Sequence, residues 1–169
     1  MRIGIIGDGA IGRYVQEAAL ERGHEIAALV LRTKYLPRRG EEPSGVLCVD
    51  TVAELPNDIE LMIDCAGHDA LRVHGPDILR SGIDLATVSL GALADSNLMQ
   101  TLEEAATQGQ SKLHLASGAI GALDCLRAAR IGRLADVTYI GRKPPQSWKG
   151  SPAEARLDLD NLTDGAKAH

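Results

Sequence analysis

The chain has no phenylalanine and almost no other aromatic residues. Aromatic side chains make up 2% of its 169 residues, whereas hydrophobic residues as a class make up 44%. The length corresponds to about one domain, or slightly more. A core of that size must therefore be built from isoleucine, leucine, valine and alanine.

Long apolar runs and an excess of basic charge are also missing. No stretch of about 18 apolar residues could form a transmembrane helix, and the N-terminus lacks the pattern of a cleaved signal peptide. The formal net charge is −5, with no stripe or tail of lysine and arginine. We therefore expect a cytoplasmic protein that binds neither membrane nor nucleic acid.

The cysteines are too few and too scattered for a disulfide framework or a zinc site. Cys48, Cys65 and Cys125 are widely spaced and form no C-x-x-C pair. Two of them lie in apolar, strand-like runs, where a free cysteine usually packs as a small hydrophobic side chain. We therefore predict no metal site.

The most informative segment is the N-terminus. An apolar run at residues 3–6 predicts a short buried strand, and residues 14–21 predict a helix. The G-x-G-x-x-G spacing between them is typical of a dinucleotide-binding unit. The first glycine permits a tight turn, the second lets the backbone approach a pyrophosphate, and the third lets the helix pack on the strand. Free N–H groups at the helix start would bind phosphate. The predicted phosphate-binding residues are Gly7, Gly9, Ala10, Ile11 and Gly12.

Strand-like and helix-like patterns alternate along the first two thirds of the chain. Apolar strands separated by helices predict a parallel sheet covered on both faces, the doubly wound Rossmann-type α/β arrangement. In such sheets the ligand lies beyond the carboxyl ends of the strands. Gly23, Gly82 and Gly109 each follow a helical pattern and are predicted to end it. We predict strands at 3–6, 25–31, 46–49, 59–65, 84–88 and 112–115, and helices at 14–21, 52–55, 69–80 and 96–108.

The character of the sequence changes after residue 115. A second turn of small residues at 116–121 precedes a predicted helix at 123–131 and a predicted strand at 137–142. We therefore expect residues 1–114 to form the dinucleotide-binding domain and residues 115–169 to begin an α+β substrate domain. An unpaired apolar strand in the second region would favour self-association, so we expect a homodimer.

The residues after the second predicted strand bear on the choice of cofactor. NAD-preferring units carry an acidic residue there, about 20 residues past the glycine turn, which binds the ribose 2′-hydroxyl. Counting from Gly12 reaches Arg32, followed by Thr33 and Lys34, with no Asp or Glu nearby in the sequence. A guanidinium can pair with a 2′-phosphate. Arg32 therefore predicts that NADP is accepted, in preference to NAD or alongside it. Alternatively, Arg32 and Lys34 are ordinary surface charges at a strand end.

Several later motifs are more specific than the glycine turn. CAGH occupies residues 65–68, VSLGA 88–92, SGAIGALD 117–124 and GRKPP 141–145. Together and in this order they resemble the L-aspartate dehydrogenases, NAD(P)-dependent enzymes that oxidise L-aspartate to iminoaspartate and feed NAD biosynthesis. The resemblance runs from Met1 to about Leu162.

The resemblance also implies roles for individual residues. Cys65, Ala66, Gly67 and His68 would line the dinucleotide site near its nicotinamide half, and the backbone of Ala119 would contact the cofactor. The cofactor would be NADP or NAD. The substrate would be L-aspartate or, in the reverse direction, oxaloacetate with ammonia.

The chain departs from this family in two respects. Asp8 lies between the first two glycines, where its carboxylate either faces the phosphates or points outward. The family's proton-handling histidine would lie beyond residue 169, so we expect a C-terminally truncated member with little or no activity. His68 is the candidate catalytic residue within the chain. Alternatively, it packs beside the ribose or caps the following helix.

Two other interpretations stay open. The chain could be a non-catalytic NAD(P)-binding module that senses the cofactor or regulates a partner, and such a module would bind cofactor without turnover. It could also be another amino-acid dehydrogenase or a dihydrodipicolinate-reductase-like enzyme, since these share the glycine turn. The CAGH and GRKPP segments argue against this last interpretation.

Overall fold

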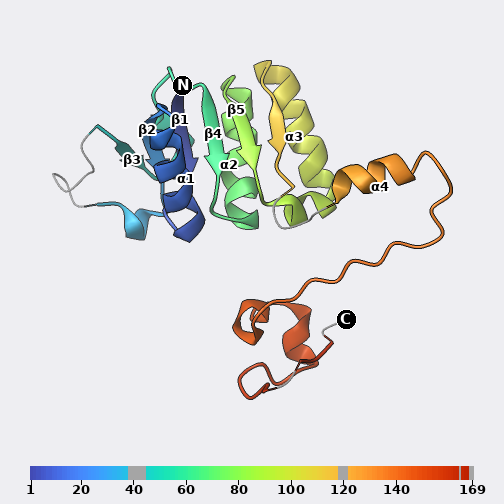
Figure 1. The fold of residues 1–169 in the computed structure, drawn as a ribbon. Helices are drawn as coiled ribbons and strands as arrows, with labels where there is room; N and C mark the ends of the chain where they lie inside the picture. Colours follow the sequence, from blue (N-terminus) through green and yellow to red (C-terminus); the bar gives the residue numbers. More distant parts are fainter. Residues whose placement is uncertain (38–44, 118–121, 164, 168–169) are drawn as a thin grey trace. The chain divides into compact units, whose positions relative to one another are not determined.

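Six short strands form one parallel sheet in the part of the chain that the computed structural model describes, residues 1–37, 45–117, 122–163 and 165–167 (Figure 1). Their order is β3-β2-β1-β4-β5-β6, and every neighbouring pair is parallel. This order is that of a doubly wound Rossmann fold, as predicted. The strands are β1 (Arg2–Ile6), β2 (Glu25–Val30), β3 (Leu47–Val49), β4 (Leu61–Asp64), β5 (Asp84–Thr87) and β6 (Leu113–Leu115).

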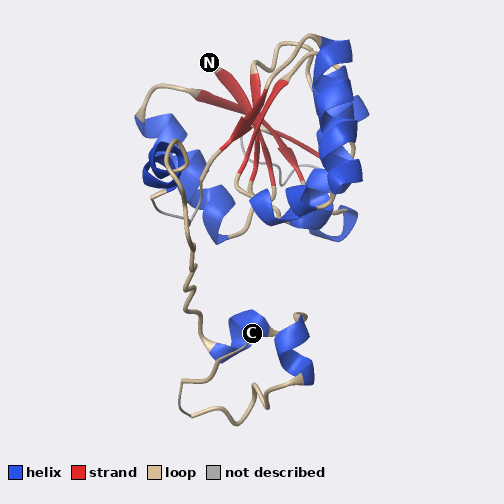
Figure 2. Cartoon of the chain, turned by 90° about the vertical axis from the view of Figure 1, so that its right-hand side faces the viewer, coloured by secondary structure: helices blue, strands red, loops and turns tan. Residues whose placement is uncertain are grey.

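Helices α1 (Ala10–Glu21), α2 (His68–Arg80) and α3 (Ser96–Gly109) cover the two faces of this sheet (Figure 2). Successive side chains of a strand point to opposite faces. Accordingly, Ile3 and Ile5 of β1 pack in one core cluster with Ala19 of α1. Ile6 belongs to the other cluster, which includes Leu71, Ile78 and Leu79 of α2 and Leu98 and Leu102 of α3.

Two of the predicted helices need correction, one in where it begins and one in its type. Helix α1 begins at Ala10 rather than Tyr14, because Gly9 takes the extended backbone conformation of an N-cap. The segment expected to be helical at 52–55 is a 3₁₀ turn over Val52–Glu54. The other predicted strands and helices of the sheet region form at nearly the expected residues.

The three glycines predicted to end helices behave differently from one another. Gly23 and Gly82 lie just past α1 and α2 with φ of 74° and 84°, as a helix stop requires. Gly109 instead belongs to α3, and Gln110 adopts the left-handed conformation after it. A Cβ atom at Gly109 would lie 1.9 Å from the carbonyl oxygen of Leu79. Glycine is therefore needed there for the close approach of α3 to the end of α2.

Residues Asp124–His169 form a second compact unit, and Met1–Leu123 form the first. Helix α4 (Leu123–Ala129) begins at the boundary, and 3₁₀ turns at Pro145–Trp148 and Pro152–Ala155 follow in the second unit. The strand predicted at 137–142 is wrong, because residues 133–144 form neither helix nor strand. A strand needs a partner for its backbone hydrogen bonds, and no described segment pairs with this one. The functional division at residue 114 stays a prediction.

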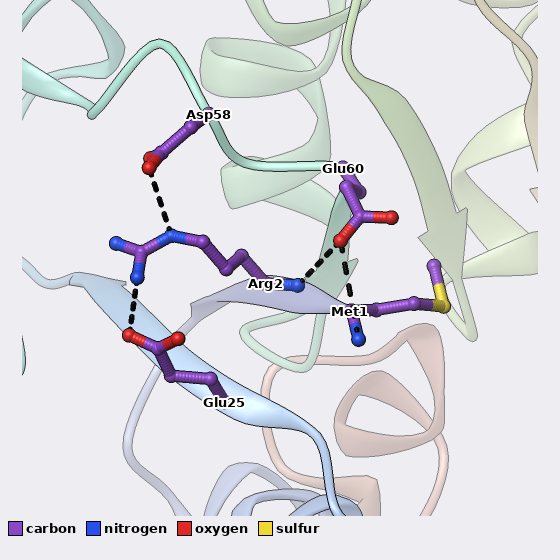
Figure 3. A network of polar contacts seen from close by, with 5 residues as sticks. All are labelled: Met1, Arg2, Glu25, Asp58 and Glu60. Atoms are coloured by element: carbon purple, nitrogen blue, oxygen red, sulfur yellow. Dashed lines mark hydrogen bonds and ion pairs between the residues drawn. The ribbon is translucent and has the colours of Figure 1, made fainter.

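Charged residues join the amino-terminal ends of three neighbouring strands (Figure 3). The Arg2 guanidinium pairs with Glu25 at the start of β2, and its Nε lies 3.1 Å from Asp58. The Arg2 backbone N–H donates to the Glu60 carboxylate at 2.8 Å, just before β4. These side chains are largely exposed, so each pair adds little stability. They mark the edge of the sheet opposite to the carboxyl ends of the strands.

None of the helices in the described part of the chain is long and apolar enough to cross a membrane.

Candidate functional site

The carboxyl ends of β2, β1 and β4 bring nearly all the predicted cofactor-binding residues to one edge of the sheet. The glycine turn follows β1, Arg32 follows β2, and the turn Cys65–His68 follows β4. Because these strands are parallel neighbours, their carboxyl ends lie side by side. Ala119 lies outside the described residues.

The three glycines of the first turn have different surroundings. Gly7 has a φ of 92°, and its N–H donates to the carbonyl of Val30 at 2.9 Å, so the chain turns tightly at the end of β1. A Cβ atom at Gly9 would meet nothing within 4 Å. A Cβ atom at Gly12 would lie 2.1 Å from the carbonyl oxygen of Gly7. The turn is therefore tight at its start, open at Gly9 and closely packed at Gly12, which is the shape that a pyrophosphate-binding loop needs.

The start of α1 suits an anionic group. Gly9 is the N-cap, and no side chain caps the helix there. The first turn of α1, all of which is described, contains no acidic residue. The first N–H groups of a helix have no partner within it, and they lie at the positive end of its dipole. The residues present therefore fit the phosphates of a dinucleotide.

The carboxylate of Asp8 is held by side chains of α1. Gln16 Nε2 donates to Asp8 Oδ1 at 3.1 Å, and Arg13 Nε lies 3.5 Å from the same oxygen. Arg13 Nε also donates to the backbone carbonyl of Asp8 at 3.2 Å. The Asp8 carboxylate is thus turned toward Gln16 and Arg13 of α1, and its charge is paired with the Arg13 guanidinium.

The turn after β4 contains no activated nucleophile. Burial, and secondly the neighbouring Asp64 carboxylate, raise the pKa of the Cys65 thiol to about 11. The thiol therefore stays protonated at neutral pH. Gly67 has a φ of 99° and leads into α2, which begins at His68.

His68 is exposed at the edge of the sheet, and its ring lies over the backbone of Gly91. A Cβ atom at Gly91 would be 2.7 Å from Cε1 of that ring. None of the hydrogen bonds between described residues involves the His68 imidazole. A general base is usually held by such a bond. The His68 ring thus packs on Gly91, and its catalytic role stays a prediction.

Sequence reasoning missed a buried polar cluster between the ends of β4 and β5. Asp64 is fully buried, and its Oδ2 accepts hydrogen bonds from the hydroxyls of Thr87 at 2.7 Å and Ser89 at 2.6 Å. Its Oδ1 accepts the N–H of Ala66 at 3.0 Å. The sequence did carry a signal, because an aspartate ends the apolar run IELMID and two hydroxyl residues end the next strand.

A carboxylate near Arg32 was also missed. No acidic residue is close to Arg32 in the sequence, but Asp50, which follows the adjacent strand β3, accepts a hydrogen bond of 2.6 Å from the Thr33 hydroxyl. Arg32 and Lys34 both lie over the Tyr35 ring, at 5.0 and 4.8 Å from its centroid. A hydrogen bond with Lys34, and then the two positive charges, lower the pKa of Tyr35. The surface beyond β2 therefore combines two cations with one carboxylate.

Comparison with known families identifies the first part of the chain. Residues 3–116 match the family model described as the homoserine dehydrogenase NAD-binding domain. The chain belongs to this family of NAD-binding domains. The first part of the chain is thus a Rossmann-type NAD(P)-binding domain, as the glycine turn and the strand order indicate.

Similar proteins extend the match beyond this domain. The L-aspartate dehydrogenase of Ruegeria pomeroyi is 46% identical over 166 residues, which cover 96% of this chain and 58% of that protein. The crystal structure of aspartate dehydrogenase from Thermotoga maritima has a TM-score of 0.58 and 24% identity, covering 78% of this chain and 52% of that one. An engineered D-amino acid dehydrogenase bound to NADP+ has a TM-score of 0.62 and 18% identity, covering 78% and 41%. The two solved structures support the fold only.

The predicted resemblance to L-aspartate dehydrogenases is confirmed at the level of sequence. The chain spans about three fifths of the length of the curated relatives it matches. What the whole relatives do is therefore considered below as a proposal for this chain.

The surroundings of Gly9 and Gly12 predict that alanine weakens cofactor binding at Gly9 and destabilises the fold at Gly12. Gly9→Ala should leave the free energy of unfolding within about 1 kcal/mol of the wild type, because the added methyl meets only open space. It should nevertheless raise the dissociation constant of NADPH about tenfold, because the methyl occupies the path of the pyrophosphate. Gly12→Ala should destabilise the fold by about 1–3 kcal/mol. Urea unfolding and NADPH fluorescence titration measure the two quantities. Unchanged NADPH affinity in Gly9→Ala would contradict a pyrophosphate at this turn.

Proposed function

We propose that this chain is the cofactor-binding part of an L-aspartate dehydrogenase. The observation that carries the proposal is the extent of the similarity. The NAD-binding family match ends at residue 116, whereas the similarity to the Ruegeria pomeroyi enzyme covers 96% of the chain. The similarity thus includes residues beyond the part that many NAD-binding oxidoreductases share. The proposed substrates are L-aspartate or, in reverse, oxaloacetate with ammonia.

In the proposed reaction a hydride leaves the α-carbon of L-aspartate, the amine loses a proton, and a C=N bond forms to give iminoaspartate. Bound NAD(P) supplies the redox chemistry by accepting the hydride. The contribution of this chain is binding and orientation. The turn Gly7–Gly12 would hold the pyrophosphate, and the turn Cys65–His68 would line the nicotinamide half. The resemblance assigns the same half to Ala119, which lies outside the described residues.

The described residues of this chain supply no well-placed base for the amine proton. The Cys65 thiol is protonated at neutral pH, and His68 packs on Gly91 without a hydrogen bond to orient it. General acid–base catalysis contributes about 10²–10⁴-fold to rate. We therefore expect the 169-residue chain to bind NAD(P) and to oxidise L-aspartate slowly or not at all.

Two further properties of the proposed enzyme rest on the sequence alone. These are the homodimer and the cytoplasmic location. The strand at 137–142, through which self-association was expected, does not form, so it supplies no apolar strand edge for a dimer contact. The dimer itself remains a prediction.

Activity on L-aspartate is tested with a chimera. Residues 1–162 of this chain are joined to the remaining part of the Ruegeria pomeroyi enzyme, at the position that the similarity aligns. We expect the chimera to reduce NADP or NAD in the presence of L-aspartate, measured as absorbance at 340 nm, and the unextended chain to show little or no turnover. D-aspartate and L-homoserine serve as control substrates. A folded chimera that binds NADPH but does not oxidise L-aspartate would contradict the proposal.

The role proposed for Arg32 is tested by cofactor selectivity. Arg32→Ala should raise the dissociation constant of NADPH about tenfold or more, because a charged hydrogen bond to the 2′-phosphate contributes about 1.5–3 kcal/mol. The dissociation constant of NADH should stay within about twofold, since NADH lacks that phosphate. Arg80→Ala is the matched control, because Arg80 ends α2 and pairs with Asp77. Equal losses for NADPH and NADH would show that Arg32 does not read the 2′ position.

A further inference from the structure

The carboxylate of Asp64 connects two turns at the candidate site. Asp64 ends β4, and it is the register partner of Thr87 at the end of β5. Three donors approach its two oxygens: the hydroxyls of Thr87 and Ser89, and the backbone N–H of Ala66. Thr87 Oγ1 in turn accepts the N–H of Ser89 at 2.9 Å. We call these four residues the Asp64 cluster.

The Asp64 cluster is not explained by its contribution to stability. Asp64 and Thr87 are 0% and 1% exposed, and no ion pair of the described residues involves Asp64. Burying a carboxylate is costly even when donors surround it, and an apolar side chain would avoid that cost. The carboxylate instead sets positions, because its hydrogen bonds hold the turn after β4 and the end of β5 in a defined arrangement.

The fixed segments contact the glycine turn. A Cβ atom at Gly7 would lie 2.8 Å from the Cβ of Ala66, so Ala66 packs directly against the first glycine. The position of Ala66 is set by its N–H bond to Asp64. At the other end of the turn after β4, the His68 ring lies over Gly91, which follows β5. A shift at the Asp64 cluster would therefore move the turn Cys65–His68 and, through Ala66, the glycine turn.

We propose that Asp64 is a positioning residue of the cofactor site, which acts through Thr87, Ser89 and Ala66 to hold the turn after β4 against the glycine turn. The inference rests on the proposed use of this edge for NAD(P). It predicts that cofactor affinity depends on the hydrogen bonds of the cluster more than on its packing.

Two substitutions of Thr87 separate hydrogen bonding from packing. Thr87→Val keeps the shape of the side chain and removes both the donor to Asp64 and the acceptor of the Ser89 N–H. Thr87→Ser keeps the donor and removes a methyl group. We expect Thr87→Val to raise the dissociation constant of NADPH about fivefold to tenfold, and Thr87→Ser to leave it within about twofold. A cluster that serves only packing would give the reverse order.

Asp64→Asn extends the test to the carboxylate itself. If the amide nitrogen faces Ala66, two N–H donors oppose each other. If it faces Thr87 and Ser89, their hydroxyls must accept instead of donate, and their own protons lose Asp64 as acceptor. We expect the dissociation constant of NADPH to rise about tenfold or more. Asp84→Asn is the matched control, because Asp84 lies at the opposite end of β5 and accepts bonds from the Lys112 N–H and His114.

Fluorescence titration with NADPH and urea unfolding of the full 169-residue chain are measured for all five proteins, including the wild type. The proposal is supported if Thr87→Val binds NADPH more weakly than Thr87→Ser and than Asp84→Asn at matched stability. It is overturned if Thr87→Val binds within twofold of the wild type, even if Asp64→Asn fails to fold. Absence of NADPH binding by the folded wild type would instead refute the proposed function.

Discussion

The arrangement of the candidate site depends on how the buried carboxylate of Asp64 is satisfied. A carboxylate with 0% exposure must find hydrogen bonds inside the protein, and a charged hydrogen bond contributes about 1.5–3 kcal/mol. Asp64 finds its donors in two places, the end of β5 and the turn that follows β4. These segments cannot move apart without leaving the charge unsatisfied. The constraint thus acts at the edge of the sheet where the glycine turn also lies.

The glycine turn adds a second constraint at the same edge. Gly12 and Ala66 both press against Gly7, so β1, α1 and the turn after β4 meet with no room for larger side chains. Of the three glycines in this turn, Gly9 faces open space, beside the free N–H groups of α1. The glycine turn is thus closely packed at Gly7 and Gly12 and open at Gly9, where the N–H groups of α1 can bind an anionic group. This arrangement suits a dinucleotide whose pyrophosphate must be held while the nicotinamide reacts.

Much of this architecture could be predicted from local sequence. The strand at residues 3–6, the glycine spacing and the turn Cys65–His68 depend on neighbouring residues, and all lie where expected. The sequence shows Asp64, Thr87 and Ser89 at the ends of apolar runs, but pairing Asp64 with Thr87, or Thr33 with Asp50, requires the strand order and the register of the sheet. Helix α3 does end at Gly109, but the left-handed residue is Gln110, and the contact of Gly109 with Leu79 of α2 could not be foreseen from local sequence. The strand expected at 137–142 failed for a related reason, since its pattern is strand-like but no described segment pairs with it.

Amide hydrogen exchange of the 169-residue chain, with and without NADPH, tests most directly whether the carboxyl edge of the sheet is the cofactor site. The account predicts slower exchange on binding at the start of α1, residues 10–13, and in the turn at residues 65–68. It predicts no change at the opposite edge, around Arg2, Glu25 and Glu60. Unchanged exchange in both turns, or slowing confined to the opposite edge, would contradict the account.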